Sequence, residues 1–378
     1  MTEENILKAK QEILKENVKQ IIKMVEQEKN KYNLLTDDLE KIQAKEKERN
    51  LLMQNNFYQF AMSTLSEALL IIKSQELWGE NSEAFFSSKY DDYLNGVDVV
   101  LYLSQTDQNE SILNQENKND VTQSNLDLES QVKQINQRLI GLGVDVTFSG
   151  RVLENKLLYL KQHLEKLSFG TLKYLPNGQI KEIEIPHFII YLPIKELEKI
   201  TIALNKLNFR NESLKHIKIK AEEELGLNII PYAIYQQIFI QVKEWEKQIR
   251  DKKDLINSQI KNLKEQLDYQ SQKTTKNKIT GVIIDKENQL LNLEIMDNTL
   301  KFIHNYFKNK IDSELLDLAP EEKNEMAGEI AKINYDFGCG FLSQIVKNQV
   351  SAKNLICPIS VDLKKEEVMN FLKDQTYL

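Results

Sequence analysis

Two short apolar runs, each with one carboxylate inside it, constrain the fold of this chain more than any other feature of its sequence. Residues 97–103 and 142–148 are rich in Val, Leu and aromatic side chains, which is typical of buried strands. The first run contains Asp98 and the second contains Asp145. A buried carboxylate is unfavourable unless it is paired, hydrogen-bonded or bound to a metal. We therefore expect the two strands to be neighbours in one sheet, with both acids in a shared site.

Acidic side chains on adjacent strands favour a divalent metal site, because Mg²⁺ and Mn²⁺ prefer oxygen ligands. Asp98 and Asp145 on adjacent strands would lie about 5 Å apart. Glu67, on the helix before the first strand, is a candidate third ligand. The alternative is that each aspartate caps a turn or pairs with a buried Lys or Arg, and that Glu67 lies on a solvated helix face. Asp91 and Asp92 are interpreted as loop or cap residues.

The elements predicted around these strands are helix, strand, insertion, strand, helix, strand, strand and helix. They occupy residues 51–74, 97–103, 104–130, 142–148, 151–167, 170–175, 187–192 and 194–207. The insertion is of low complexity, and a short helix over 127–139 is expected to follow it. Apolar strands joined through a helix predict an α+β or α/β core, in which helices flank a small mixed sheet.

Two charged segments carry narrow apolar stripes of the coiled-coil type. Residues 5–48 and 238–269 repeat apolar side chains mostly at intervals of three, four or seven, which predicts long helices. The sequence leaves open whether they pair with each other or form a homodimer. The predicted organisation is a charged helix, the α/β core, a helical coiled-coil segment and a helical C-terminal region. These regions span residues 1–50, 51–208, 209–280 and 281–378.

Composition limits the classes of partner. No apolar segment is long enough to span a bilayer, and the first twenty residues have no apolar signal core, so we expect a cytoplasmic protein without membrane contact. Two cysteines, Cys339 and Cys357, are too few for a disulfide framework. The net charge of −7 disfavours non-specific coating of nucleic acid. The basic residues 273–278 could still contact phosphate.

Three short patterns together carry a resemblance to a known family. They are Glu67 on a helix, Gly-Val-Asp at 96–98 opening one strand, and Asp-Val-Thr at 145–147 in a second strand that precedes a helix. In this order they resemble the PD-(D/E)xK nuclease-like superfamily over about residues 57–205, as seen in uncharacterised proteins of bacterial candidate phyla. The resemblance implies a restriction-endonuclease-like core, Mg²⁺ or Mn²⁺ held by the three acids, and phosphodiesterase activity on nucleic acid.

The chain departs from the family pattern at Thr147, where the superfamily normally has a lysine. A hydroxyl group cannot supply the positive charge that stabilises a developing anion. The resemblance then implies that Lys156, on the next helix, takes the catalytic role of that lysine, with Lys173 as a weaker candidate. If neither lysine reaches the carboxylates, the fold would be retained without catalysis.

Two functions of different classes remain open at this point. The first is a metal-dependent nuclease-like protein that acts on or binds nucleic acid, either active or catalytically degenerate. The second is a non-enzymatic scaffold or interaction protein, whose coiled-coil segments bind a helical partner or a second copy. The first requires the carboxylates of Glu67, Asp98 and Asp145 to converge in one site, whereas the second allows them to point apart.

Overall fold

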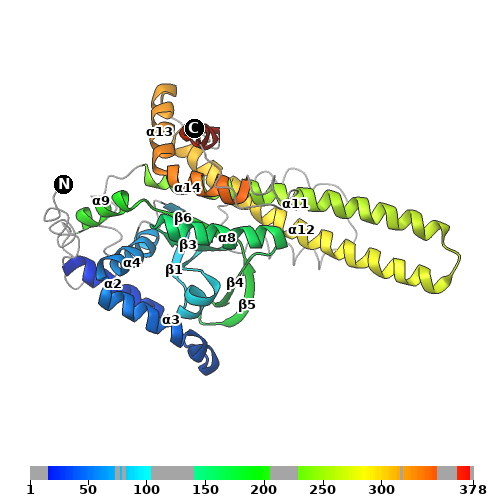
Figure 1. Cartoon of the computed structure of the whole chain (residues 1–378), viewed down its shortest axis with the longest axis horizontal. Coiled ribbons are helices and arrows are strands. Elements are labelled where there is room, and N and C mark those ends of the chain that lie inside the picture. Colours follow the sequence, from blue (N-terminus) through cyan, green and yellow to red (C-terminus); the bar gives the residue numbers. More distant parts are fainter. Residues whose placement is uncertain are drawn as a thin grey trace, which may run out of the picture. The chain divides into compact units, whose positions relative to one another are not determined.

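Figure 1 shows the computed structural model of the protein. The structure describes residues 16–72, 77–78, 82–103, 140–204, 229–315, 318–346 and 364–374. The predicted insertion over 104–130 and the predicted helix over 127–139 lie outside these residues. The chain divides into two compact units. Unit 1 is formed by Met1–Ser149 and Gly170–Pro231, and unit 2 by Gly150–Phe169 and Tyr232–Leu378.

A small mixed sheet of four strands lies at the centre of unit 1. Its strand order is β1-β2-β3-β6, with antiparallel pairing except between β3 and β6, which are parallel. The strands are β1 (Glu83–Phe86), β2 (Val99–Leu103), β3 (Ile140–Thr147) and β6 (His187–Tyr191). The predicted strands over 97–103 and 142–148 are therefore confirmed as direct neighbours. The mixed sheet flanked by helices is confirmed as the fold class.

The sheet forms where the sequence is apolar on both strand faces. All five residues of β6 are buried, and so are four of the five in β2, which is expected when both faces of a sheet are covered. One cover is a hairpin of β4 (Gly170–Tyr174) and β5 (Ile180–Ile185). A Cβ atom at Gly143 would come within 3.1 Å of the Ile185 side chain. Glycine at this position therefore lets the hairpin pack closely on β3.

The helices of unit 1 pack around an apolar central helix. They are α2 (Glu16–Lys29), α3 (Thr36–Asn55), α4 (Phe57–Ile72) and α9 (Ile194–Leu204). α4 is the buried one, with eleven buried residues, and it contacts α2, α3, α9 and the first three strands. Its apolar character on nearly all sides agrees with a helix that is enclosed by other elements.

The prediction of one continuous helix over 5–48 is wrong for the described residues. The helix ends at Lys29 and a new one begins at Thr36. Two tyrosines hold the turn between them. The hydroxyl of Tyr32 donates to the Phe86 carbonyl oxygen at 2.6 Å, and the Leu35 amide donates to the Tyr174 hydroxyl at 3.0 Å. These contacts come from distant parts of the chain, which local periodicity does not report.

The prediction of a single helix over 51–74 is also wrong at its start. α3 continues to Asn55 and α4 begins at Phe57, with Asn56 between them. The Asn56 side-chain oxygen accepts a hydrogen bond from the Gln59 amide at 3.2 Å, which is an N-cap interaction.

A short π-helical turn (Asp91–Asn95) connects the β1 side of the sheet to β2 and anchors the β4–β5 hairpin. The Asp91 carboxylate accepts hydrogen bonds from the amides of Lys173 and Tyr174 at 2.8 and 3.0 Å. It also accepts from the Ser88 hydroxyl at 2.7 Å and from the Asn95 side-chain amide at 2.7 Å. One buried carboxylate therefore satisfies four donors and joins two segments more than seventy residues apart.

Replacement of Asp91 by Asn should destabilise unit 1 by about 2–4 kcal/mol, because an amide cannot accept from all of these donors. Urea unfolding measures the loss, and hydrogen exchange should show faster exchange at the Lys173 and Tyr174 amides. The matched control is Asp37→Asn, an exposed residue in the first turn of α3. It should change stability by less than about 1 kcal/mol. An equal effect of both substitutions would contradict this role for Asp91.

All of the regular secondary structure described in unit 2 is helical. Its elements are α8 (Gly150–Lys166), α11 (Ile230–Tyr269), α12 (Lys273–Glu314), α13 (Pro320–Ile333), α14 (Tyr335–Phe341), a π-helical turn (Leu342–Val346) and α16 (Lys365–Asp374). The helices predicted over 151–167 and 238–269 are confirmed, and so is the helical character of the C-terminal region in its described part. The boundary predicted at residue 281 falls inside α12.

α11 and α12 form a long antiparallel hairpin (Figure 1). Lys253 of α11 contacts Glu294 and Asp297 of α12 at 2.6 and 2.8 Å, and Lys264 contacts Glu287 at 3.2 Å. The partner of the 238–269 stripe is therefore α12. None of the described helices combines the length and the apolar character required to cross a membrane.

Candidate metal centre

Three carboxylates from different elements converge inside unit 1. Glu67 lies on α4, Asp92 in the π-helical turn and Asp98 directly before β2. One oxygen of each lies within 4.8 Å of the others. The structure thus brings together two of the predicted ligands, Glu67 and Asp98. It adds Asp92, which the sequence analysis had interpreted as a loop or cap residue.

Glu67 points into the protein because of the helix that carries it. α4 is apolar and buried over most of its length, so an acid in its second half has little access to water. Glu67 is 3% exposed and Asp98 is 6% exposed. The sequence analysis named Glu67 as a candidate ligand from its place on the helix before the first strand.

Lys29 supplies the positive charge that contacts this group. Its ammonium nitrogen donates to Glu67 Oε2 and to Asp92 Oδ2, at 2.6 Å in each case. Lys29 is the last residue of α2 and is 2% exposed. It continues the buried stripe of that helix, since Val18, Ile22 and Val25 precede it at intervals of four, three and four residues. The sequence analysis missed Lys29, although this spacing was a signal.

A second cation, Arg49 of α3, lies at the edge of the same region. Its guanidinium donates to Glu26 Oε1 at 3.0 Å and to the Thr64 hydroxyl at 3.3 Å, and it stands 5.0 Å from the centroid of the Phe60 ring. Burial opposes the charge of Arg49, but Glu67 and Asp92 outweigh it and raise the pKa of the guanidinium. Arg49 therefore adds positive potential without a direct ion pair to the three acids.

The protonation of the group reflects burial and mutual repulsion. Burial raises the pKa of Glu67 to about 7, with Asp98 and Asp92 pushing in the same direction and Lys29 opposing them. Burial also raises the pKa of Asp92. Burial alone would lower the pKa of Lys29, but Asp92 and Glu67 outweigh it and raise the pKa. The lysine stays charged, while the carboxylates are held in a crowded anionic site.

Asp98 has a second role in the sheet. Its Oδ2 accepts a hydrogen bond from the Val146 amide of β3 at 2.7 Å, and its own amide donates to the Val144 carbonyl oxygen at 2.9 Å. The side chain thus takes the place of a strand carbonyl where β2 begins. This contact fixes the Asp98 carboxylate at the edge of the acidic group.

Asp145 is buried but is not a member of the group of three. In β3 it shares a sheet face with Gly143, two residues before it, and this is the face covered by the β4–β5 hairpin. Its Oδ2 lies 3.6 Å from the position that a Cβ atom of Gly96 would occupy, and the His187 ring lies 3.8 Å from the same position. The structure therefore places Asp145 beside Gly96 and His187.

The two predicted basic partners lie on different elements. Lys156 is on α8. The ammonium of Lys173 is 2.6 Å from Asp38 and stands over the Tyr90 ring at 4.9 Å. The Thr147 hydroxyl accepts from the Ser149 amide at 3.3 Å. Among the described residues of unit 1, Lys29 is the lysine that contacts the acidic group.

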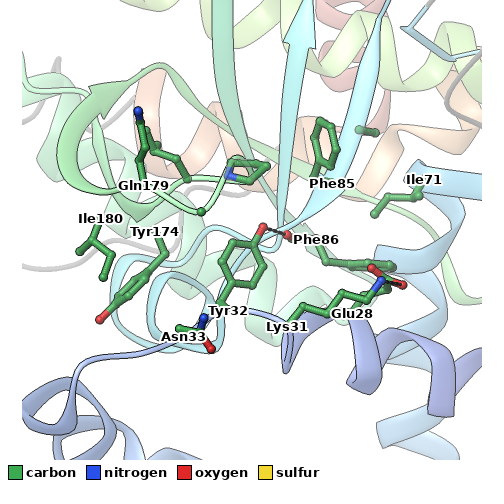
Figure 2. Close-up of a pocket in the computed structure, with 14 residues that line it drawn as sticks. Glu28, Lys31, Tyr32, Asn33, Ile71, Phe85, Phe86, Tyr174, Gln179 and Ile180 are labelled. Carbon is green, nitrogen blue, oxygen red and sulfur yellow. Dashed lines mark hydrogen bonds and ion pairs between the residues drawn. The ribbon is translucent and has the colours of Figure 1, made fainter.

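A cavity of about 360 Å³ opens beside β1 (Figure 2). Tyr32, Phe85, Phe86 and Tyr174 contribute to its wall, and the dashed line in Figure 2 marks the bond from the Tyr32 hydroxyl to Phe86. Lys31 of the segment after α2 also lines it. The three acids and Lys29 do not, so the cavity and the acidic group are separate features.

No family model, curated protein or solved structure matches the chain. Three carboxylates within 4.8 Å are a donor set that suits a hard cation such as Mg²⁺ or Mn²⁺. Two of these acids, Glu67 and Asp92, also form ion pairs with Lys29.

Replacement of Lys29 by Met should destabilise the metal-free protein by about 3–5 kcal/mol, because two buried carboxylates lose their shared counter-charge. Urea unfolding at neutral pH measures the change. Lys31→Met is the matched control, since the Lys31 side chain is 67% exposed and pairs with Glu28 at the surface. It should cost less than about 1 kcal/mol. A Lys29→Met variant as stable as the control would mean that Glu67 and Asp92 are not both ionised in the folded protein.

Stability should also depend on pH through Glu67. Its folded pKa of about 7 lies above the ordinary value of 4.5, so the folded state binds more protons than the unfolded state between these values. Glu67 therefore makes stability fall as pH rises from about 4.5 to about 7, by at most about 1.4 kcal/mol per pH unit. Glu67→Gln should remove this part of the profile. Glu48→Gln, at a side chain that is 73% exposed, should leave it unchanged.

Proposed function

We propose that unit 1 is a metal-dependent phosphodiesterase of the nuclease-like type, in which Glu67, Asp92 and Asp98 hold a divalent cation. The observation that carries this proposal is the convergence of the three carboxylates within 4.8 Å in a buried site. The pKa values of Glu67 and Asp92 are raised in this crowded site. A divalent cation would stabilise their charged forms more than the single ammonium of Lys29 does. Oxygen donors alone favour Mg²⁺ or Mn²⁺ over softer metals.

The residues of the chain would have distinct roles in this site. A bound divalent ion supplies Lewis-acid polarisation of a phosphoryl oxygen. Asp98 is positioned by its hydrogen bond from Val146 at 2.7 Å. Lys29 orients Glu67 and Asp92, and its ammonium is the positive charge for a developing anion. In this proposal Lys29 takes the role that the resemblance to the PD-(D/E)xK superfamily suggested for Lys156.

Nucleic acid is the proposed substrate, and this part rests on the resemblance. The small mixed sheet flanked by helices and the pairing of the two acid-bearing strands support it. A catalytically degenerate protein would keep the same acids with Lys29 as a permanent counter-ion and would bind nucleic acid without cleaving it. Separate measurements of metal binding and of cleavage would distinguish the active form from the degenerate one.

A second candidate is the non-enzymatic scaffold. The observation that favours it is the hairpin of α11 and α12, with 40 and 42 residues in its two helices. Helices of this length extend over about 60 Å and are typical of elements that bridge or bind other chains. The two functions reside in different units and do not exclude each other.

Millimolar Mn²⁺ or Mg²⁺ should raise the melting temperature of the wild type, because the ion binds the folded state alone. The gain is about 2.7 kcal/mol at a hundredfold excess over the dissociation constant. Glu67→Gln and Asp98→Asn should lose most of this shift. Asp145→Asn is the control, since Asp145 lies outside the group of three, and its metal-induced shift should equal that of the wild type.

Cleavage is tested on the same variants with labelled single- and double-stranded DNA and RNA. Metal-dependent cleavage that disappears in Glu67→Gln and persists in Asp145→Asn supports the enzyme. A metal-induced shift without cleavage supports the degenerate form. A wild type whose melting temperature ignores both ions would overturn the metal site and leave the scaffold.

A further inference from the structure

α12 has two apolar sides. One side packs in the hairpin, where Phe307 lies 5.3 Å from the Tyr235 ring of α11. The other side is solvent-exposed, with Ile284, Leu291 and Ile295 exposed by 53, 61 and 58%. At 100° per residue, these three fall on the helix face opposite the buried residues Leu293, Met296, Leu300, Ile303, Phe307 and Ile311. Ile283, in the first part of α12, is also buried and lies about 100° from Ile284.

The exposed residues follow the spacing of a coiled-coil seam. Ile284, Leu291, Ile295 and the half-buried Phe302 lie in one line with two asparagines, Asn288 and Asn298. The steps between these six positions are four, three, four, three and four residues, which is the a/d pattern of a heptad repeat. We call these six residues the outer stripe of α12.

The outer stripe is the same when it is followed in either direction. Its order is apolar, Asn, apolar, apolar, Asn, apolar. Consider a second copy of α12 that lies antiparallel to the first, with the twofold axis midway between Leu291 and Ile295. Leu291 of one copy would then face Ile295 of the other. Ile284 would then face Phe302, and Asn288 would face Asn298. That midpoint is also close to the middle of α12, so the two helices would overlap along their whole length.

The charged residues beside the stripe fit the same arrangement. In the antiparallel register, Glu287 of one copy lies opposite Lys301 of the other on each side of the axis, and both side chains are at least half exposed. Parallel pairing would place Glu287 beside Asn292 and leave no opposite charges in contact. Glu294 approaches its own copy at the axis, where Lys253 neutralises it from 2.6 Å.

We propose that the outer stripe of α12 is a homodimer interface, in which two copies of this chain pack antiparallel about a twofold axis. A twofold interface requires a self-complementary surface, and the order of this stripe provides one. The paired asparagines exclude other registers, because an amide that faces an apolar layer loses its hydrogen bond. The proposal is independent of the proposed metal site, which lies in unit 1.

Sedimentation velocity and light scattering on the full chain test the oligomeric state at micromolar concentrations. The wild type should be a dimer, and Leu291→Lys should weaken the dimer at least about tenfold by burying a charge in the seam. Leu255→Lys is the matched control, because Leu255 is 51% exposed on α11 and lies outside the stripe. It should remain dimeric, and circular dichroism should show equal helix content in both variants.

Charge reversal tests the flanking pairs. Glu287→Lys should weaken the dimer by placing two positive charges together, and the further change Lys301→Glu in the same chain should restore it. A monomeric wild type, or a dimer that Leu291→Lys leaves intact, would overturn the proposal.

Disulfide formation tests the direction of pairing in a chain with Cys339 and Cys357 replaced by Ser. A mixture of Asn288→Cys and Asn298→Cys chains should form an intermolecular disulfide on mild oxidation, while either chain alone should not. Efficient cross-linking of Asn288→Cys with itself would mean a parallel pair and would overturn the antiparallel interface.

Discussion

The structure of unit 1 depends on the ammonium of Lys29 between two buried carboxylates. Its contacts of 2.6 Å to Glu67 and Asp92 join the end of α2, the middle of α4 and the turn before β2. Apolar packing fixes these elements only approximately, because many side-chain arrangements fill a core similarly well. A buried ion pair is more selective, since a displaced partner leaves an unpaired charge in a poorly solvated place.

The same interaction places the ammonium in direct relation to the proposed metal. Lys29 and a divalent ion would both contact the carboxylates of Glu67 and Asp92. The repulsion between these carboxylates that Lys29 already relieves is therefore no longer available to favour binding of the ion. Burial is the main cause of the raised pKa of Glu67, and the charges of Asp98 and Asp92 add to it while Lys29 opposes it. Groups with perturbed protonation are frequent at functional sites, which agrees with the cation site proposed here.

The sequence predicted what depends on local pattern. The two apolar runs predicted neighbouring strands, and two of the acids proposed as ligands, Glu67 and Asp98, lie together in the structure. It did not predict Asp92 or Lys29, because their roles depend on where a turn and a helix end lie in space. Lys29 ends a charged helix that continued past it in the prediction, and the break after it is set by Tyr32 and its distant acceptor in β1.

The adjacent residues Asp91 and Asp92 bind hydrogen-bond donors from different parts of unit 1. Asp91 accepts hydrogen bonds from the backbone of β4, while Asp92 accepts one from Lys29. The turn that carries both residues therefore connects the hairpin to the charged site. A ligand or substitution that tilted the β4–β5 hairpin would also move a carboxylate against the ammonium. The cation affinity proposed for this site would then depend on the position of a hairpin that contributes no ligand to it.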